Sequence, residues 1–177
     1  MHTSSLNIPS DQHQRVMKHL LPRRPKTEEA AFLFCRALQT DAATEFHFLD
    51  LHLVPPSEFN YKSLYGIELN DHCRASVIKR AHDLNASLLE FHSHPRSTLV
   101  EFSPSDRGGF AEFVPHVWWR LKHRPYAAIV VGPDGFDSLT WVSNPERPDC
   151  VLDLQIGQAR LKPTGLTLDN WEHRHEF

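Results

Sequence analysis

The sequence predicts an α/β fold in which a mixed β-sheet is flanked by helices. Two observations carry this prediction. Apolar runs of strand length recur along the chain, and between them lie segments whose apolar residues are spaced as on one face of a helix. The clearest example is a strand-like run at 44–54, a helical pattern at 70–84 and a second apolar run at 88–91. Such a succession of strand, helix and strand is typical of an α/β unit.

Length and composition predict one domain that spans residues 1–177. The chain of 177 residues is 40% hydrophobic and 23% charged, which suits an ordinary globular domain with a single core. Residues 1–25 are expected to form an N-terminal extension of one short strand and one helix. Residues 144–177 are expected to form C-terminal strands and a tail.

Local signals predict the remaining elements in order. Pro115 should end or kink the helix that begins near Asp106, because proline lacks a backbone N–H. Residues 57–66 are expected to be irregular, and the aromatic run at 117–119 is expected to pack in the core. The predicted strands are 6–8, 28–35, 44–54, 88–91, 126–131, 138–142, 151–156 and 166–168, and the predicted helices are 10–21, 70–84 and one that begins at Ser103.

Charge and cysteine content exclude several classes of protein. A net charge of -3 and a pI near 6.5 show no electrostatic footprint for nucleic acid or for an anionic membrane. The first residues lack the pattern of a secretory signal, and no apolar run is long enough to span a bilayer. The cysteines Cys35, Cys73 and Cys150 are odd in number and far apart, which favours reduced core thiols in a cytoplasmic protein.

One stretch contains histidine, serine and aspartate side chains at fixed spacing. It reads His92-x-His94-Pro95, seven residues, Ser103, two residues, Asp106. Residues two apart on a strand point to the same face, so His92 and His94 can converge on one ion. Ser103 is expected to cap a helix, which places Asp106 in its first turn. Two imidazoles and one carboxylate are the ligand count of a catalytic zinc, with one position left open for water.

Each half of this pattern has an ordinary explanation when it stands alone. The chain contains 13 histidines, so a single His-x-His is unremarkable, and a Ser-Pro-Ser-Asp box is more often only a helix cap. The conjunction is different, since five specified positions coincide by chance about once in a few million windows at average residue usage. The spacing therefore predicts a zinc site at His92, His94 and Asp106.

An acidic pair opens an earlier strand-like run. Glu28 and Glu29 precede an apolar segment that ends at Cys35. Because side chains alternate along a strand, only one of the two carboxylates can face a site on a given side. The residues by themselves leave both candidates open.

At these residues the sequence resembles the JAB1/MPN/Mov34 (JAMM) zinc metalloprotease family, in its bacterial type. The family motif is a Glu, a long gap, His-Ser/Thr-His-Pro, seven residues, Ser, two residues and Asp. The resemblance implies a JAMM/MPN α-β-α domain, similar to that of cytidine deaminases, with zinc on His92, His94 and Asp106. It implies Glu29 as the general base, although Phe32 stands where the family usually has Gly, and Glu28 remains the alternative. It also implies Ser103 as an oxyanion donor, a role that competes with helix capping.

The resemblance further implies a peptidase or isopeptidase, similar to deubiquitinases, that acts at the C-terminus of ubiquitin or a ubiquitin-like protein. E1-like and E2-like partners in a bacterial anti-phage operon are then expected. Alternatives are a non-catalytic MPN scaffold and a RadC-like, DNA-associated protein, although Arg96 and Ser97 depart from the RadC motif. The cysteine ligands of a nucleoside deaminase are absent. A second metal site at His173 and His175 lacks a third ligand at suitable spacing.

Overall fold

The computed structural model describes residues 2–171. Its strands are β1 (Thr3–Ile8), β2 (Ala30–Gln39), β3 (Ala43–Leu53), β4 (Phe59–Ser63), β5 (Gly66–Leu69), β6 (Ser87–Ser93), β7 (Tyr126–Gly132), β8 (Gly135–Trp141), β9 (Leu152–Ile156) and β10 (Ala159–Leu161). Its helices are α1 (Ser10–Leu20), α2 (Asp71–Asp83), α3 (Pro104–Arg120) and α4 (Leu166–Asp169), with a 3-10 turn η1 at Pro56–Glu58.

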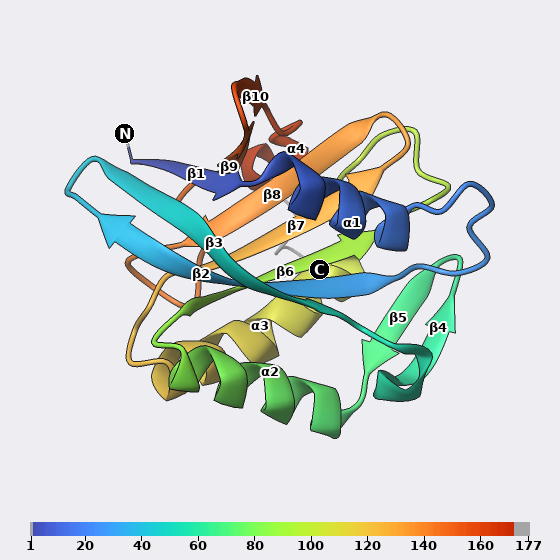
Figure 1. Ribbon diagram of the computed structural model, residues 1–177, viewed down its shortest axis with the longest axis horizontal. Coiled ribbons are helices and arrows are strands. Elements are labelled where there is room, and N and C mark those ends of the chain that lie inside the picture. The colour runs from blue at the N-terminus through green and yellow to red at the C-terminus, as the bar shows by residue number, and fades with distance from the viewer. Residues whose placement is uncertain (1, 172–177) are drawn as a thin grey trace.

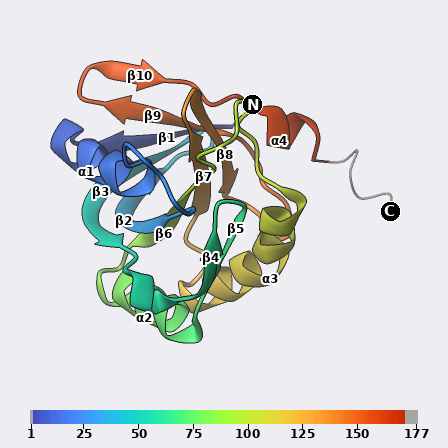
Figure 2. The ribbon, with the colours of Figure 1, turned by 90° about the vertical axis from the view of Figure 1, so that its right-hand side faces the viewer.

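The architecture is a curled mixed sheet with helices on both faces, which confirms the predicted α/β class. Eight strands follow the order β10-β9-β1-β3-β2-β6-β7-β8, and β4 and β5 form a separate hairpin. Helices α2 and α3 lie together below the sheet in Figure 1, and α1 lies above it. Seen from the side, the sheet curls around α1, and the β4–β5 hairpin stands near the N-terminal end of α3 (Figure 2). Ser138 of β8 exchanges two hydrogen bonds with the backbone of Leu152 in β9, which draws the two ends of the curl together.

The core lies in two layers because the central strands are apolar on both faces. Along β2, Phe32 and Phe34 pack toward α2 and α3, whereas Leu33 and Cys35 pack toward α1. Strand side chains alternate between the faces of a sheet, so a run without alternating polarity is the pattern of a strand covered on both sides. The position of β2 at the centre of the sheet therefore follows from its sequence.

Two tryptophans that differ in exposure test this description of the core. Trp141 is 1% exposed and Trp119 is 68% exposed. Trp141→Ala is expected to lower the free energy of unfolding by about 3–5 kcal/mol, because it leaves a large cavity. Trp119→Ala should change it by about 0.5 kcal/mol or less. Equal losses for the two variants in urea unfolding would contradict the placement of Trp141.

Several predicted helix boundaries are confirmed, with one correction. Asn70 caps α2 by accepting a hydrogen bond from the backbone of Cys73. Of the two effects expected of Pro115, an end or a kink, the end is contradicted, because α3 continues through Pro115 to Arg120. Tertiary packing outweighs the one helical hydrogen bond that proline removes, since Val117 and Trp118 beyond it are buried in the core.

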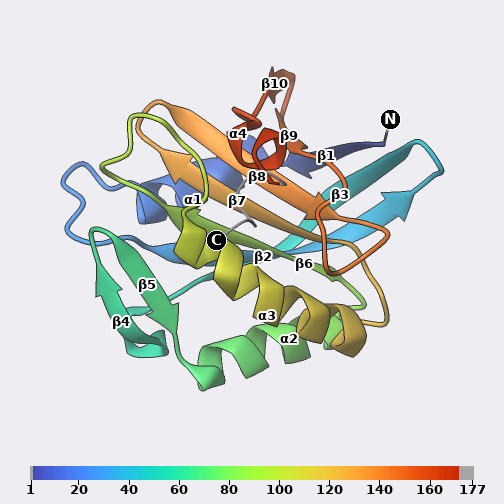
Figure 3. The same cartoon turned by 180° about the vertical axis from the view of Figure 1, so that it is seen from behind.

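The expectation of an irregular segment at 57–66 is wrong. Residues 59–63 and 66–69 form the β4–β5 hairpin, which stands apart from the main sheet. Its strands are short and carry few buried residues, so the alternation that marks a half-buried strand is weak there. In Figure 3 the hairpin stands beside the N-terminal part of α3.

The expectation of a strand at 166–168 is also wrong, because these residues begin α4. The buried carboxylate of Asp137 accepts hydrogen bonds from the backbone N–H groups of Gly165 and Thr167 and from the Thr167 hydroxyl. A carboxylate at a helix N-terminus pairs donors that the helix itself leaves free. This long-range partner decides the conformation of residues 166–168. The short strand β10, which precedes α4, was not predicted either.

Of the run at 117–119, Val117 and Trp118 are buried as predicted, but Trp119 is 68% exposed, so the expectation of core packing is wrong for that residue. Cys35, Cys73 and Cys150 are buried free thiols, as predicted. Within residues 2–171, no helix has the length and apolar character needed to cross a bilayer. The second His-x-His pair, His173 and His175, lies outside the described residues.

Candidate metal centre

Two histidines leave the end of β6 toward the same side of the sheet. His92 is the second-last residue of that strand, which pairs with β2 on one side and with β7 on the other. His94 lies just beyond the strand, and its backbone N–H donates to the carbonyl of Val131 at 2.8 Å. The central strands therefore hold both imidazoles. His92 is almost fully buried, and the His94 side chain is 13% exposed.

The third member of the cluster comes from the first turn of α3. Ser103 and Asp106 form a capping box: the Ser103 hydroxyl accepts from the Asp106 N–H, and the Asp106 carboxylate accepts from the Ser103 N–H. The segment before this cap is held in turn by α4, since the backbone N–H of Phe102 donates to the Thr167 hydroxyl at 2.9 Å. As predicted, the helix start fixes Asp106.

The three side chains meet at a point with the spacing of metal ligands. The Nε2 atoms of His92 and His94 are 3.2 Å apart, and they lie 3.4 and 3.3 Å from Oδ2 of Asp106. Two ligands about 2.0–2.1 Å from a tetrahedral zinc are about 3.3 Å from each other. The three atoms thus occupy three corners of a zinc-sized tetrahedron. Their nitrogen and oxygen donors suit zinc, so the residues present fit the ion.

Electrostatics within the cluster keep the carboxylate charged. Burial alone would raise the pKa of Asp106, but His92, His94 and the Ser103 hydroxyl hold it well below its usual range. Burial likewise opposes the charged form of His92, but Asp106 prevails and raises the pKa of His92 to about 9. The cluster therefore attracts positive charge, which a divalent cation supplies.

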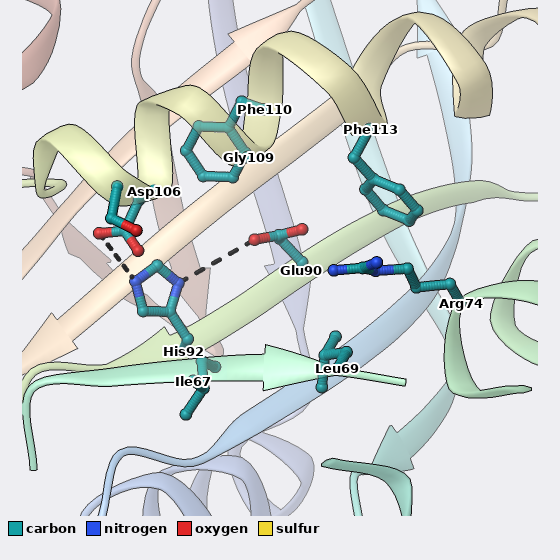
Figure 4. Close-up of a pocket in the computed structure, with 10 residues that line it drawn as sticks. Ile67, Leu69, Arg74, Glu90, His92, Asp106, Gly109, Phe110 and Phe113 are labelled. Carbon is teal, nitrogen blue, oxygen red and sulfur yellow. Dashed lines mark ion pairs between the residues drawn. The ribbon is translucent and has the colours of Figure 1, made fainter. Parts of the chain in front are cut away.

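The other nitrogen of His92 faces a second carboxylate. Nδ1 of His92 lies 4.0 Å from Oε1 of Glu90, and the Tyr126 hydroxyl donates to the same carboxylate. Figure 4 shows His92 between Asp106 and Glu90, with Arg74 and Phe113 beyond. Burial raises the pKa of Glu90, although His92 and the Tyr126 hydrogen bond oppose it. A carboxylate on the far side of a ligating imidazole orients the ring and raises its basicity.

Of the two glutamates proposed as base, the structure brings Glu28 to the cluster and places Glu29 elsewhere. Oε1 of Glu28 lies 3.9 Å from Nε2 of His94, and the Glu28 side chain is 6% exposed. Burial raises the pKa of Glu28, partly offset by His94 and His92. Glu29, the residue preferred from the sequence, instead forms an ion pair with Lys62 of β4 at 2.6 and 2.7 Å.

The pairing register explains which glutamate faces the histidines. Ala30 of β2 lies opposite His92 of β6, and directly paired residues point to the same face of a sheet. Continuing by two residues places Glu28 on that face. The chain is held in this register by Ser93, whose backbone N–H donates to the Glu29 carbonyl and whose hydroxyl accepts from the Glu29 N–H, both at 3.0 Å. Ser93 thus has a structural role.

A glycine lets the loop after His94 lie close to the sheet. A Cβ atom on Gly132 would stand 2.6 Å from a methyl group of Val100 and 3.2 Å from the Ser97 carbonyl. No side chain fits at that approach without moving the loop. The sequence pattern did not single out Gly132 as a site residue, because the packing partners are distant in sequence.

Two adjoining cavities run past the cluster along the β4–β5 hairpin. The larger, of about 320 Å³, is lined by Glu28, His94, Ser103 and the tip of the hairpin around Tyr65. The smaller, of about 130 Å³, lies beside His92 and Glu90 and carries apolar walls from β5 and α3 (Figure 4). Ile67 and Asp106 line both. The two cavities together form a groove beside the candidate centre.

No protein-family model and no curated protein sequence matches this chain. The geometry by itself defines the class: an α/β protein with two histidines and one aspartate arranged to hold a metal ion beside a buried glutamate.

Proposed function

We propose that this protein is a zinc-dependent hydrolase of the JAMM type, which cleaves amide bonds at the C-terminal tail of a ubiquitin-like protein. One observation carries the proposal. Three potential ligand atoms lie at mutual distances of 3.2, 3.3 and 3.4 Å, and the buried carboxylate of Glu28 lies 3.9 Å from Nε2 of His94. We further propose that its fold is a JAMM/MPN domain similar to that of cytidine deaminases.

His92, His94 and Asp106 would hold the zinc. When bound, zinc supplies Lewis acidity, which polarises the scissile carbonyl and makes a water molecule acidic enough to be deprotonated near neutral pH. Glu90, whose carboxylate accepts a hydrogen bond from the Tyr126 hydroxyl and lies 4.0 Å from Nδ1 of His92, would help to orient the ring of His92. The low exposure of the cluster limits competition from bulk water.

Glu28 would act as the general base and acid. It takes a proton from the attacking water and delivers it to the departing amine, so the carboxylate is restored after each turnover. Burial favours this role, because it raises the pKa of Glu28 and so makes the carboxylate more basic. This assignment replaces Glu29, whose carboxylate is occupied by Lys62.

Ser103 would position Asp106. Its hydroxyl donates to Oδ2 of Asp106 at 2.7 Å and accepts from the Asp106 N–H at 3.1 Å. Both hydrogen bonds hold the ligand in place. Donation to a developing oxyanion, the role expected from the family resemblance, would require the first of these bonds to open.

The groove supports a peptide substrate in extended form. Within residues 2–171, β5 pairs only with β4, so its other edge is available for an added strand. Ile67 and Leu69 of β5 line the smaller cavity and offer apolar contacts to such a strand. A ubiquitin-like tail laid there would lead its terminal residue toward His92 and His94.

Metal removal tests the proposal. Fusions that carry a short peptide after the C-terminus of bacterial ubiquitin-like proteins should be cleaved at the junction, as seen by mass spectrometry of the products. Cleavage should disappear with a chelator and return when zinc is added back, since the ion supplies the Lewis acid. The control is a fusion with proline after the scissile bond. A zinc-loaded protein that leaves every such fusion intact would argue for a non-catalytic role.

A further inference from the structure

A second group of potential metal ligands lies away from the candidate centre. His52 at the end of β3, Glu58 at the end of η1 and Cys73 in the first turn of α2 place their ligand atoms within 4.8 Å of one another. Nε2 of His52 and Oε2 of Glu58 are 2.7 Å apart. None of these residues takes part in the hydrolysis proposed above.

These three residues surround the base of the β4–β5 hairpin. Glu58 immediately precedes β4, and Cys73 follows β5 by one helical turn. The backbone also closes this base, because the N–H of Asn70 donates to the carbonyl of Glu58 at 2.9 Å. His52 lies on the sheet itself, opposite Phe32 of β2. A bond among the three side chains would therefore tie both ends of the hairpin to the sheet.

The donor set suits zinc. One imidazole, one carboxylate and one thiol are all zinc ligands, and the combination of soft sulfur with nitrogen disfavours magnesium and calcium. Cys73 is fully buried, and the side chains of His52 and Glu58 are 23% and 16% exposed. One side of the group is thus closed by the core and the other is open to solvent. A fourth ligand from water can approach from that side.

We propose that His52, Glu58 and Cys73 form a second zinc site, which anchors the hairpin wall of the groove. Binding replaces the hydrogen on the Cys73 sulfur by a sulfur–zinc bond and releases that proton to solvent, with no change of oxidation state. His52 and Glu58 separate from their 2.7 Å hydrogen bond to about 3.3 Å, the spacing of two zinc ligands.

The charges around the group are compatible with this site. Burial and Glu58 raise the pKa of Cys73 to about 12, so the thiol is protonated without metal and hydrogen-bonds Glu58. His72 and Arg74 lie on either side of Cys73. The charge of His72 lowers the pKa of Glu58, and the charge of Arg74 lowers the pKa of Cys73. Zinc would replace the thiol proton as the partner of Glu58, and the carboxylate offsets its charge.

The number of zinc ions per chain, from native mass spectrometry, tests the site without reference to hydrolysis. The wild-type protein should bind two, and Asp106→Ala, Cys73→Ser and His52→Ala should each bind one. Cys150→Ala is the matched control and should bind two. Because Cys73 lies in the core, His52→Ala decides the question if Cys73→Ser does not fold. A zinc content in His52→Ala equal to that of the wild type would overturn the second site.

Cobalt substitution identifies the ligand directly. A thiolate bound to cobalt gives charge-transfer absorption in the near ultraviolet, and the first centre has only nitrogen and oxygen donors. The absorption should persist in Asp106→Ala and Cys150→Ala and vanish in Cys73→Ser. Its absence from the wild type would overturn the second site and leave the first centre unaffected.

The anchoring role has its own measurement. In Asp106→Ala, which should bind zinc mainly at the second site, added zinc should slow hydrogen exchange of the backbone amides at 59–69. Exchange in β9, which pairs with β1 and β10, serves as the internal reference. Unchanged exchange at 59–69 in a variant that binds one zinc would overturn the anchoring role.

Discussion

Glu28→Gln is expected to reduce hydrolysis by about 10²–10⁴-fold, the usual contribution of a general base, while zinc remains bound. The amide has nearly the same shape as the carboxylate but cannot accept the proton of water. The three ligands are untouched, so zinc content should equal that of the wild type. The loss should appear in kcat with little change in KM, because Glu28 acts on the reacting water.

Glu29→Gln is the matched control for this prediction. The two residues are neighbours and the substitutions are chemically identical, but Glu29 contacts Lys62 of β4 instead of His94. Glu29→Gln should retain most of the wild-type activity. If Glu29→Gln lost activity and Glu28→Gln kept it, the base would be the residue that the family resemblance suggested.

Asp106→Ala is expected to abolish both zinc binding at the first centre and hydrolysis. It removes the only carboxylate among the three ligands and leaves two imidazoles to hold a dication. A site with two neutral ligands lacks the charge and the ligand count that zinc requires. Isothermal titration with zinc and the fusion cleavage assay should both show the loss.

Asp106 also caps α3, so the stability effect needs a separate control. Ser103→Ala removes the capping hydroxyl but leaves the three ligands in the chain. It should lower the free energy of unfolding by about 0.5–2 kcal/mol, as caps usually do, and still bind zinc. His94→Ala removes a ligand outside the cap and should lose the zinc of the first centre. A zinc content equal to that of the wild type in both Asp106→Ala and His94→Ala would contradict the first centre.

Local sequence determined much of the fold and the identity of the candidate metal ligands. The alternation of apolar runs with helical periodicity is a local property, and it predicted the α/β class. The caps at Asn70 and Ser103 depend only on residues within one turn, so both helix starts were predicted correctly. His92, His94 and Asp106 likewise follow from a strand end and a helix start a few residues apart.

Contacts between distant segments decided the rest. The conformation of 166–168 depends on Asp137, almost 30 residues earlier, and the continuation of α3 past Pro115 depends on the core beneath it. The β4–β5 hairpin, which lines the groove, carries too few buried residues for a clear local pattern.

The choice between Glu28 and Glu29 shows most directly why local sequence could not determine the whole site. A strand presents alternate residues to opposite faces, and the sequence determined that only one of the two glutamates could face the histidines. Which one depends on the register of β2 against β6, set by hydrogen bonds between Ser93 and Glu29 across the sheet. A shift of one residue would exchange their positions. The local sequence determined the candidates, and only the tertiary structure placed Glu28 beside the histidines.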